Sequence, residues 1–232
     1  MKPGPRVMEE LRREVQGSLY PGCELVVAGN VGDSGIRRIV TEKYDILRSR
    51  FSESFLRKAA TADLFVPEER QSDSPGTAFR FSFARKGRQS ENVTIEKEAA
   101  ALMLGDGGFL AGLWKMAESS DTGLFVDLRN VPIRQETIEI CEYFSLNPYA
   151  LFSGGTLLIG TNNGNGLIEG LVERGIPAAV IGHAKKGNDR ILKSGTIKRY
   201  LDRPSPDEIG KILQETEKPF ACSAGKGEEK WL

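Results

Sequence analysis

The chain has 232 residues, of which 39% are hydrophobic and 28% charged, and its 32 Lys and Arg residues equal its 32 Asp and Glu residues. This length suits one large domain, and the composition is typical of a globular protein. The charge balance argues against a general polyanion-binding role, so we expect no nucleic-acid partner. No run approaches the roughly 18 apolar residues of a membrane helix, and the N-terminus lacks a signal-peptide pattern. We therefore expect a cytoplasmic protein without a membrane partner.

The N-terminus is predicted to form a short amphipathic helix within an extension of residues 1–19. Pro5 suits the first position of a helix, where its missing N–H is not needed. The apolar residues that recur every four positions are Val7, Leu11 and Val15.

A strand, two helices and an irregular segment are expected next. Residues 23–29 have the apolar β-branched core of a buried strand, and residues 36–47 repeat apolar side chains at helical intervals. Asp33 or Ser34 would cap that helix, and a further helix is predicted to start at Ser52.

Residues 66–92 differ from the rest of the chain, because they are polar and rich in turn-forming residues. They flank the alternating segment "FRFSF", in which Phe79, Phe81 and Phe83 are spaced as in a strand. We interpret 66–92 as an insertion that carries one short strand within a single domain of residues 20–217. Residues 218–232 are predicted to form a flexible tail.

The second half of the chain is predicted to contain further strands and helices and a final hairpin. Their order is strand 124–128, helix 131–144, strand 156–161, helix 166–174, strand 178–183 and a hairpin that turns at Ser194-Gly195. The helix at 131–144 should end at Asn147-Pro148 and turn inward Ile133, Ile138, Cys141 and Phe144. Strands and helices alternate without the regularity of a doubly wound fold, so the sequence predicts an α+β fold with a mixed β-sheet covered by helices.

Two glycine-rich turns are candidate phosphate-binding loops, because each follows an apolar run and precedes a helix, where backbone N–H groups can hold an anion. The first, "GNVGDSG", contains Gly29, Gly32 and Gly35, and the second, "LGDGG", contains Asp106, Gly107 and Gly108. The first has the spacing G-x-x-G-x-x-G, which is that of neither a dinucleotide-binding loop nor a Walker loop. Their Asp residues would repel a phosphate while capping a helix well, so a structural role is also open. A third glycine turn, "FSGGT" at 152–156, is expected to shape close packing.

No residue pattern demands catalysis. Glu136, Glu139 and Glu142 share one helix but are typical of its solvated face, and Cys141 falls among the apolar positions of that helix. Cys23, Cys141 and Cys222 have no metal-ligand spacing and form no disulfide framework, which favours a reducing compartment. His183 is the one histidine, which excludes a histidine-rich metal site. We expect no metal site and name no catalytic residue.

A basic segment lies near the C-terminus. Between residues 185 and 203 two acidic residues accompany seven basic ones, Lys185, Lys186, Arg190, Lys193, Lys198, Arg199 and Arg203. A solvated hairpin face is favoured over a binding patch here.

Four segments, taken in order, resemble the C-terminal domain of the aminoimidazole ribonucleotide (AIR) synthetase superfamily. They are "YPGCELVVAGNVGDSGI", "FSESFLRKA", "DGGFLAGLWKMAESSDTGLFVDLRNVPIRQETIEICEYFSLNPYALFSGGTLLIGT" and "GIPAAVIGHAKKGNDRI". Within the superfamily the likeness is greatest to hydrogenase maturation factors of the HypE type. The resemblance covers most of residues 20–213 and implies the fold of that domain.

The resemblance also implies what is different here. Family members have an N-terminal domain that dimerises and carries the acidic, metal-binding part of an ATP site; only about twenty residues precede the resembling region here, so we expect that domain to be absent. The hydrogenase factors end in a cysteine that receives a carbamoyl group, whereas Cys222 lies ten residues from the end of this chain.

The glycine turn at 104–108 departs from the family motif His-Asp-x-Thr-x-Gly-Gly. Aligning its two glycines places Leu102 at the His, Met103 at the Asp and Gly105 at the Thr. The helix start is retained while the polar groups are lost.

Three functions compete. The first, which we favour, is a non-catalytic ligand-binding or protein-interaction module, acting as a homo-oligomer such as a dimer. The second is half of a split ATP-dependent enzyme, completed by a separate chain like the N-terminal domain, with ATP and magnesium at the shared site. The third is an independent enzyme with rebuilt chemistry, which no residue pattern supports. A split enzyme should keep a polar cleft at 102–105, so the first function is preferred.

Overall fold

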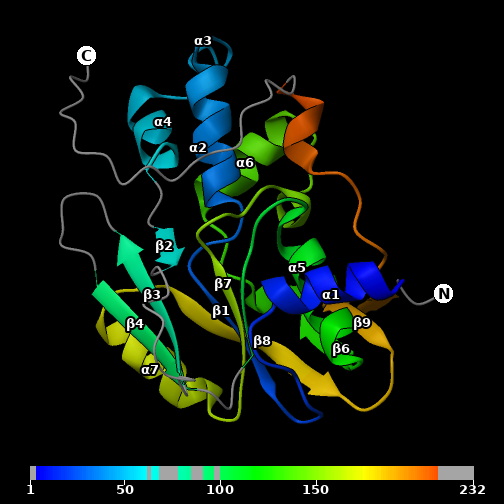
Figure 1. Ribbon diagram of the computed structural model, residues 1–232. Helices are drawn as coiled ribbons and strands as arrows, with labels where there is room; N and C mark the ends of the chain where they lie inside the picture. Colours follow the sequence, from blue (N-terminus) through cyan, green and yellow to red (C-terminus); the bar gives the residue numbers. More distant parts are fainter. Residues whose placement is uncertain (1–3, 62–63, 68–77, 85–90, 97–99, 214–232) are drawn as a thin grey trace.

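The computed structural model describes residues 4–61, 64–67, 78–84, 91–96 and 100–213, with side chains for 4–61 and 100–213. A mixed seven-stranded sheet with the order β10-β9-β6-β8-β1-β7-β5 forms its centre (Figure 1). The strands are β1 Glu24–Ala28, β5 Ala100–Met103, β6 Gly123–Asp127, β7 Leu157–Thr161, β8 Ala178–Lys185, β9 Arg190–Ser194 and β10 Ile197–Tyr200. All neighbouring strands are antiparallel except β6 and β9. The predicted α+β fold with a mixed sheet is confirmed.

Helices cover both faces of this sheet because its strands alternate their apolar side chains between the faces. In β1, Leu25 and Val27 enter one core while Val26 and Ala28 enter another. The first core lies beneath α5 (Gly108–Ser120), against which α1 (Pro5–Glu14) packs. The second lies beneath α7 (Gly164–Glu173). None of the described helices is both long and apolar enough to cross a membrane.

A helical cluster with its own core stands beyond one end of the sheet (Figure 1). It consists of α2 (Asp33–Glu42), α3 (Tyr44–Leu47), α4 (Glu53–Ala59), α6 (Gln135–Tyr143) and the 3-10 helix η3 (Glu208–Lys211). Two further 3-10 helices, η1 (Leu128–Asn130) and η2 (Pro148–Ala150), connect elements of the domain. As predicted, Ser52 precedes α4, where its side chain accepts a hydrogen bond from the Phe55 N–H.

A separate three-stranded sheet contains β2 (Leu64–Pro67), β3 (Ala78–Ala84) and β4 (Glu91–Glu96) in that order. The prediction of one strand in the insertion was therefore incomplete: β3 matches "FRFSF", but β2 and β4 pair on either side of it. Strand β4 contains the strand-favouring residues Val93, Thr94 and Ile95, which lie beyond the segment interpreted as an insertion. The predicted tail lies outside the described residues.

Three helix predictions needed correction. The helix expected over 36–47 breaks at Lys43 into α2 and α3. In α6, Ile138 was expected to face the core but is 41% exposed, and Ile140 is the buried residue instead. This helix ends at Tyr143, ahead of Ser145, whose φ of 55° stops a right-handed helix before Asn147 is reached.

Candidate functional site: the junction of three glycine-rich turns

The three glycine-rich turns of the sequence meet at the end of the sheet that faces the helical cluster. Strand β7 runs antiparallel to β1 and β5, so the ends of those two strands lie beside its start. In this register Leu157 pairs with Ala28 and with Met103. The turns at 29–35, 104–108 and 152–156 therefore come together, and we refer to them as the glycine junction.

The turn at 152–156 provides the acceptors for two amides of the first turn. The Gly32 N–H donates to the Ser153 hydroxyl at 2.9 Å, and the Gly35 N–H donates to the Phe152 carbonyl at 3.0 Å. The Ser34 hydroxyl donates to the Gly154 carbonyl. These contacts bind the start of α2 to the segment before β7.

The second turn is packed against the same segment. The Leu104 N–H donates to the Thr156 carbonyl at 2.8 Å, and the Gly105 carbonyl accepts from the Ser153 N–H at 3.3 Å. A Cβ on Gly108, whose φ is 62°, would lie 2.3 Å from the Leu151 carbonyl oxygen. Glycine is needed there because neither the conformation nor the space admits a side chain.

The N-terminus of α5 is occupied by a carboxylate from a distant part of the chain. One oxygen of Asp207 accepts from the Gly107 N–H at 2.7 Å. Its other oxygen accepts from the N–H groups of Phe152 at 3.1 Å and Ile209 at 2.9 Å. Asp106, the predicted cap, is exposed and makes no capping hydrogen bond, so that prediction was wrong. The residue before the helix is Gly107, in a left-handed conformation.

The Asp207 carboxylate stays costly to ionise despite these three donors. Burial raises its pKa, the three N–H groups act in the opposite direction, and the nearby charge of Asp106 raises it further. The Asp207 carboxyl group thus occupies the place at the start of α5 where an external anion would have to bind.

A buried ion pair connects α2 to α6 and to the end of α4. The Asp33 carboxylate accepts from Arg134 at 3.1 Å and from the Thr137 hydroxyl at 3.0 Å. The Arg134 guanidinium also donates to the carbonyls that end α4, those of Lys58, Ala59 and Thr61. Burial raises the pKa of Asp33, and Arg134 and Thr137 oppose that rise.

The prediction that Asp33 or Ser34 caps α2 is therefore wrong. The capping position belongs to Gly32, whose φ is 82°, and no side chain bonds to the first turn from there. Asp33 is the first helical residue, and its carboxylate turns away to Arg134.

The structure brings together all the residues that were predicted as phosphate-facing: Gly29, Gly32, Gly35, Asp106, Gly107 and Gly108. Their glycine amides have internal acceptors, including the Pro177 carbonyl for Gly29 and the Gly105 carbonyl for Gly108. Contact with a phosphate stays a prediction. Sequence reasoning missed Asp207, Ser153 and Arg134; for Asp207 the only local signal was its capping of η3, which gives no hint of Gly107.

The positions aligned with the polar family motif lie in strand β5 and the turn after it. Leu102 is 4% exposed and belongs to the core beneath α5, and Met103 packs against the core on the opposite face. Their side chains thus fill the two cores that flank the sheet.

Cys141 and His183 are the remaining groups considered for chemistry. Cys141 is buried, and burial together with Glu208 raises the pKa of its thiol to about 12, which disfavours the reactive thiolate form. His183 is exposed and stacks on Phe125, with ring centroids 5.5 Å apart. Among the described residues, no three His, Cys, Asp or Glu side chains gather closely enough to hold a metal ion. Cys222 lies outside them.

Comparison with known families gives a match over the region that contains β5 to β9. Residues 92–194 match the family described as AIR synthase related protein, C-terminal domain. The resemblance to this domain is thereby confirmed. A comparison with curated protein sequences found no match.

Solved structures of HypE share the fold. The hydrogenase maturation protein HypE of E. coli is 19% identical with a TM-score of 0.57, over 85% of this chain and 55% of that one. A HypE-HypF complex is 12% identical with a TM-score of 0.55, over 81% of this chain and 54% of that one. HypE in complex with ATP is 16% identical with a TM-score of 0.53, over 84% of this chain and 54% of that one. This chain therefore spans about half the length of the HypE chains it resembles.

Proposed function

We propose that the chain is a non-catalytic binding module that has kept the fold of an ATP-dependent relative without its chemistry. The observation that carries this proposal is Asp207. Its carboxylate holds the Gly107 amide at the start of α5, the place where a helix in this setting would otherwise offer an N–H to a phosphate. The amides of Gly29, Gly32, Gly35 and Gly108 have internal acceptors as well.

The apolar side chains at the aligned motif positions support the same proposal. A cleft that positions a nucleotide needs polar groups, whereas Leu102 lies in a core and Met103 packs against one. Replacing polar groups with packed apolar ones favours fold stability and removes the means of transition-state stabilisation.

The experiment that tests this proposal is a titration of the purified chain with ATP and magnesium, followed by thermal unfolding and by measurement of ADP release. We expect no shift and no ADP. A ligand at a hundredfold excess over its dissociation constant would add about 2.7 kcal/mol of stability, which is readily measured. Metal-dependent ATP turnover by the isolated chain would overturn the proposal.

A second candidate is one half of a split ATP-dependent enzyme. The similarity to HypE in complex with ATP favours it, because that similarity extends over 84% of this chain but only 54% of that one. A clear ATP-induced rise of the thermal midpoint without turnover would support this alternative. A separate chain would then complete the site for ATP and magnesium.

A binding module needs a partner, and we propose two kinds: a second copy of the chain, or a separate protein chain. HypE is described in complex with HypF, which makes a protein partner a reasonable expectation. Light scattering of the purified chain distinguishes the two, since only the first gives a dimer without additions.

A further inference from the structure

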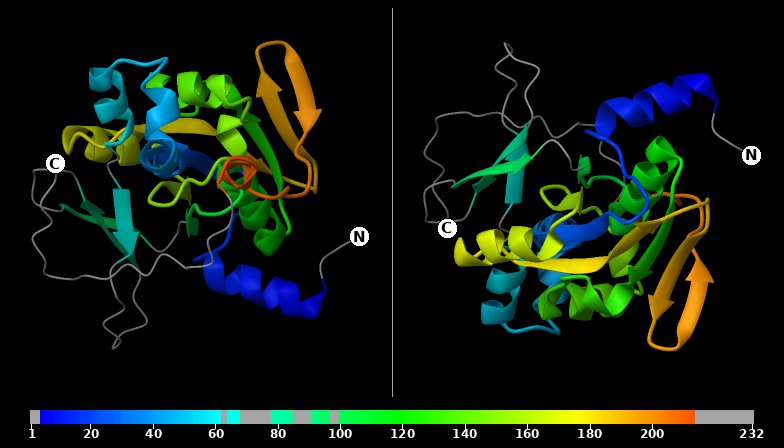
Figure 2. Two further views of the ribbon diagram at one scale, coloured as in Figure 1. Left: turned by 90° about the horizontal axis from the view of Figure 1, so that it is seen from above. Right: turned by 90° about the horizontal axis from the view of Figure 1, so that it is seen from below.

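The β9–β10 hairpin forms one edge of the seven-stranded sheet and projects from the body of the molecule (Figure 2). Strand β10 pairs with β9 on one side, and no described strand pairs with its other side. All four residues of β10, from Ile197 to Tyr200, are exposed. At the opposite edge, β5 is covered in part, because Gln16 bridges to Ala101.

The free edge of β10 presents backbone groups that are ready to pair. The Leu201 N–H donates to the Arg190 carbonyl at 2.7 Å. Residues of an antiparallel pair alternate between facing the partner strand and facing away. Lys198 and Tyr200 therefore direct their N–H and C=O groups outward, to the side that has no strand.

Apolar side chains flank this edge on both faces. Ile197 is 69% exposed and Tyr200 is 66% exposed, the two highest values among the large hydrophobic side chains of the described residues. They are three positions apart, so they point to opposite faces of the sheet. An added strand would cover both, whereas a ligand lying flat on one face would reach only one.

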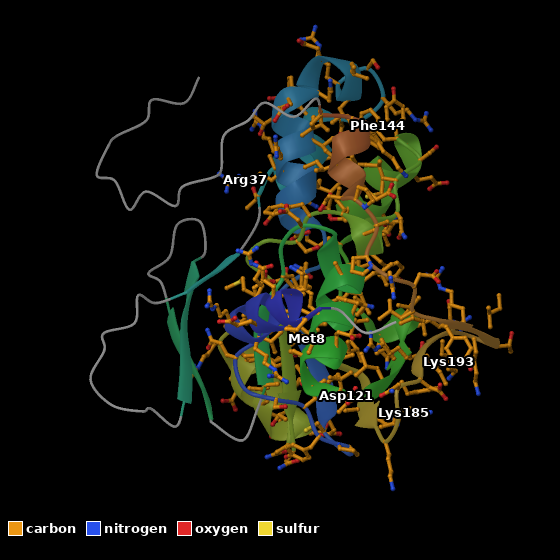
Figure 3. The ribbon with its side chains drawn as sticks, turned by 45° about the vertical axis from the view of Figure 1, so that its right-hand side comes forward. Met8, Arg37, Asp121, Phe144, Lys185 and Lys193 are labelled. Carbon is orange, nitrogen blue, oxygen red and sulfur yellow. The ribbon has the colours of Figure 1, made fainter. Side chains whose placement is uncertain are left out.

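The charge around the edge is positive. Two of its basic residues already have partners, Arg190 with Glu118 and Lys193 with Asp127 at 3.1 Å. Lys185, Lys186, Lys198 and Arg199 add four positive charges, against Asp189 and Asp202 in the same segment, and the Arg129 guanidinium lies beside the hairpin turn at Gly195. The Lys198 ammonium also lies over the Phe125 ring, 6.0 Å from its centroid, and among the described residues no carboxylate pairs with it. Figure 3 labels Lys185 and Lys193 on the side of the molecule that carries the hairpin. An acidic partner matches this surplus.

Two other interpretations explain less. A second copy paired antiparallel through β10 about Lys198 or Arg199 would set that residue against its own copy, and like charges opposite each other destabilise a sheet. A solvated edge guarded by charges accounts for Lys198 and Arg199. It does not account for Ile197 and Tyr200, because an edge strand protected against pairing would carry polar residues at these two positions.

We propose that β10 binds an extended acidic segment of a partner protein, which adds a strand to the sheet. Its backbone pairs with Lys198 and Tyr200, its carboxylates lie near Lys198 and Arg199, and its apolar side chains cover Ile197 and Tyr200. This inference rests on the proposed function, because it names the partner chemistry of a binding module.

The test uses the full chain and a labelled octapeptide of two Glu-Glu-Val-Val repeats, which places acidic and apolar side chains on both faces of an added strand. The matched control is the octapeptide of two Lys-Lys-Val-Val repeats. Fluorescence anisotropy gives the affinity, and amide chemical shifts of the isotopically labelled chain locate the peptide. We expect the largest shifts at 197–201 and about tenfold weaker binding of the basic peptide.

Two substitutions at one position separate backbone pairing from charge. Lys198→Pro removes an outward N–H and the charge, while Lys198→Gln removes the charge alone; a proline on an edge strand with its N–H side free is tolerated. We expect Lys198→Pro to bind about tenfold more weakly than Lys198→Gln. Tyr200→Thr tests the apolar contact without a proline in the strand, and it should weaken binding about fivefold. Circular dichroism and the thermal midpoint check that each variant folds.

Several outcomes would overturn the inference: no binding at millimolar peptide, equal affinity of Lys198→Pro and Lys198→Gln, or shifts away from β10. A dimer that dissociates on Tyr200→Thr would assign the edge to a second copy, and tighter binding of oligothymidylate than of the acidic peptide would assign it to nucleic acid. Each contradicts the proposal. Lack of peptide binding leaves the non-catalytic assignment standing, while ATP turnover removes that assignment whatever the peptide does.

Discussion

The glycine junction and the β9–β10 hairpin differ in where their backbone polar groups are directed. At the junction, the amides of Gly32, Gly35 and Gly107 bond to acceptors from 152–153 and from Asp207. At the hairpin, Lys198 and Tyr200 direct theirs outward. The segment that most resembles a ligand loop in sequence is therefore closed, and the segment that resembles a solvated turn is open. Glycine content alone does not distinguish a binding loop from a packed corner.

The largest expected effect comes from filling the junction. Gly108→Ala places a Cβ 2.3 Å from the Leu151 carbonyl oxygen at a φ of 62°. Strain and overpacking together should cost about 3 kcal/mol of unfolding free energy, measured by urea denaturation.

Gly105→Ala is the matched control, because a Cβ on Gly105 meets nothing within 4 Å. It should change stability by less than about 0.5 kcal/mol. Equal stability of the two variants would show that the junction is not closed, and the comparison with the hairpin would fail.

The second effect tests which carboxylate holds the start of α5. Asp207→Ala leaves the N–H groups of Gly107, Phe152 and Ile209 without their acceptor. We expect a loss of about 2 kcal/mol, measured by chemical denaturation. Asp106→Ala, at the neighbouring exposed position, should stay within about 0.5 kcal/mol of the parent. A larger loss from Asp106→Ala than from Asp207→Ala would restore the local cap predicted from sequence.

The sequence predicted those elements whose cause is local. The β-branched run of β1, the Ser52 start of α4 and the hairpin turn near Gly195 depend on neighbours in the chain, and each was placed within a few residues. Strand β5 was missed because four apolar residues beside a glycine turn resemble the approach to a buried helix.

The site was predicted less well because its contacts cross long stretches of sequence. Asp207 and Gly107 are 100 residues apart, and Asp33 and Arg134 are 101 apart. From the sequence Asp33 was predicted only as a helix cap, and nothing pointed from Asp207 to Gly107. Only the antiparallel register of β1, β5 and β7 brings the three turns together, and no single segment encodes that register.

A third test compares the pH dependence of two carboxylates. Burial raises the pKa of Asp33 above 3.8, so its ionisation opposes folding and stability falls as pH rises from 3.8 through the raised pKa. The parent should therefore gain stability relative to Asp33→Asn as pH is lowered through that window. Unfolding free energies measured from about pH 7 to pH 4 give the slope.

Asp127, on the hairpin side of the sheet, supplies the opposite sign. Hydrogen bonds from the Arg129 N–H and from Lys193 lower the pKa of Asp127, so its contribution is present above 3.8 and is lost as pH falls through the lowered pKa. The parent should lose stability relative to Asp127→Asn as pH falls from 3.8 through the lowered pKa, so this pair is compared below pH 4. If both pairs gave slopes of the same sign, the contrast between a buried and an open carboxylate would be wrong.

The smallest effect is expected at the hairpin edge. Ile197→Thr and Tyr200→Thr each replace an exposed side chain with a residue suited to strands, so each should leave the free energy of unfolding within about 0.5 kcal/mol of the parent. Leu192→Ala, in the adjacent strand and 2% exposed, should cost about 3 kcal/mol.

The contrast matters because it separates a surface kept for binding from a surface needed for folding. Thermal and urea unfolding of the three variants give the comparison, with the peptide affinity measured on the same samples. Loss of affinity at Tyr200→Thr without loss of stability is the signature of a docking edge. A stability loss at Ile197→Thr or Tyr200→Thr as large as that of Leu192→Ala would instead mean that these side chains pack within the fold, and β10 would no longer be an open edge.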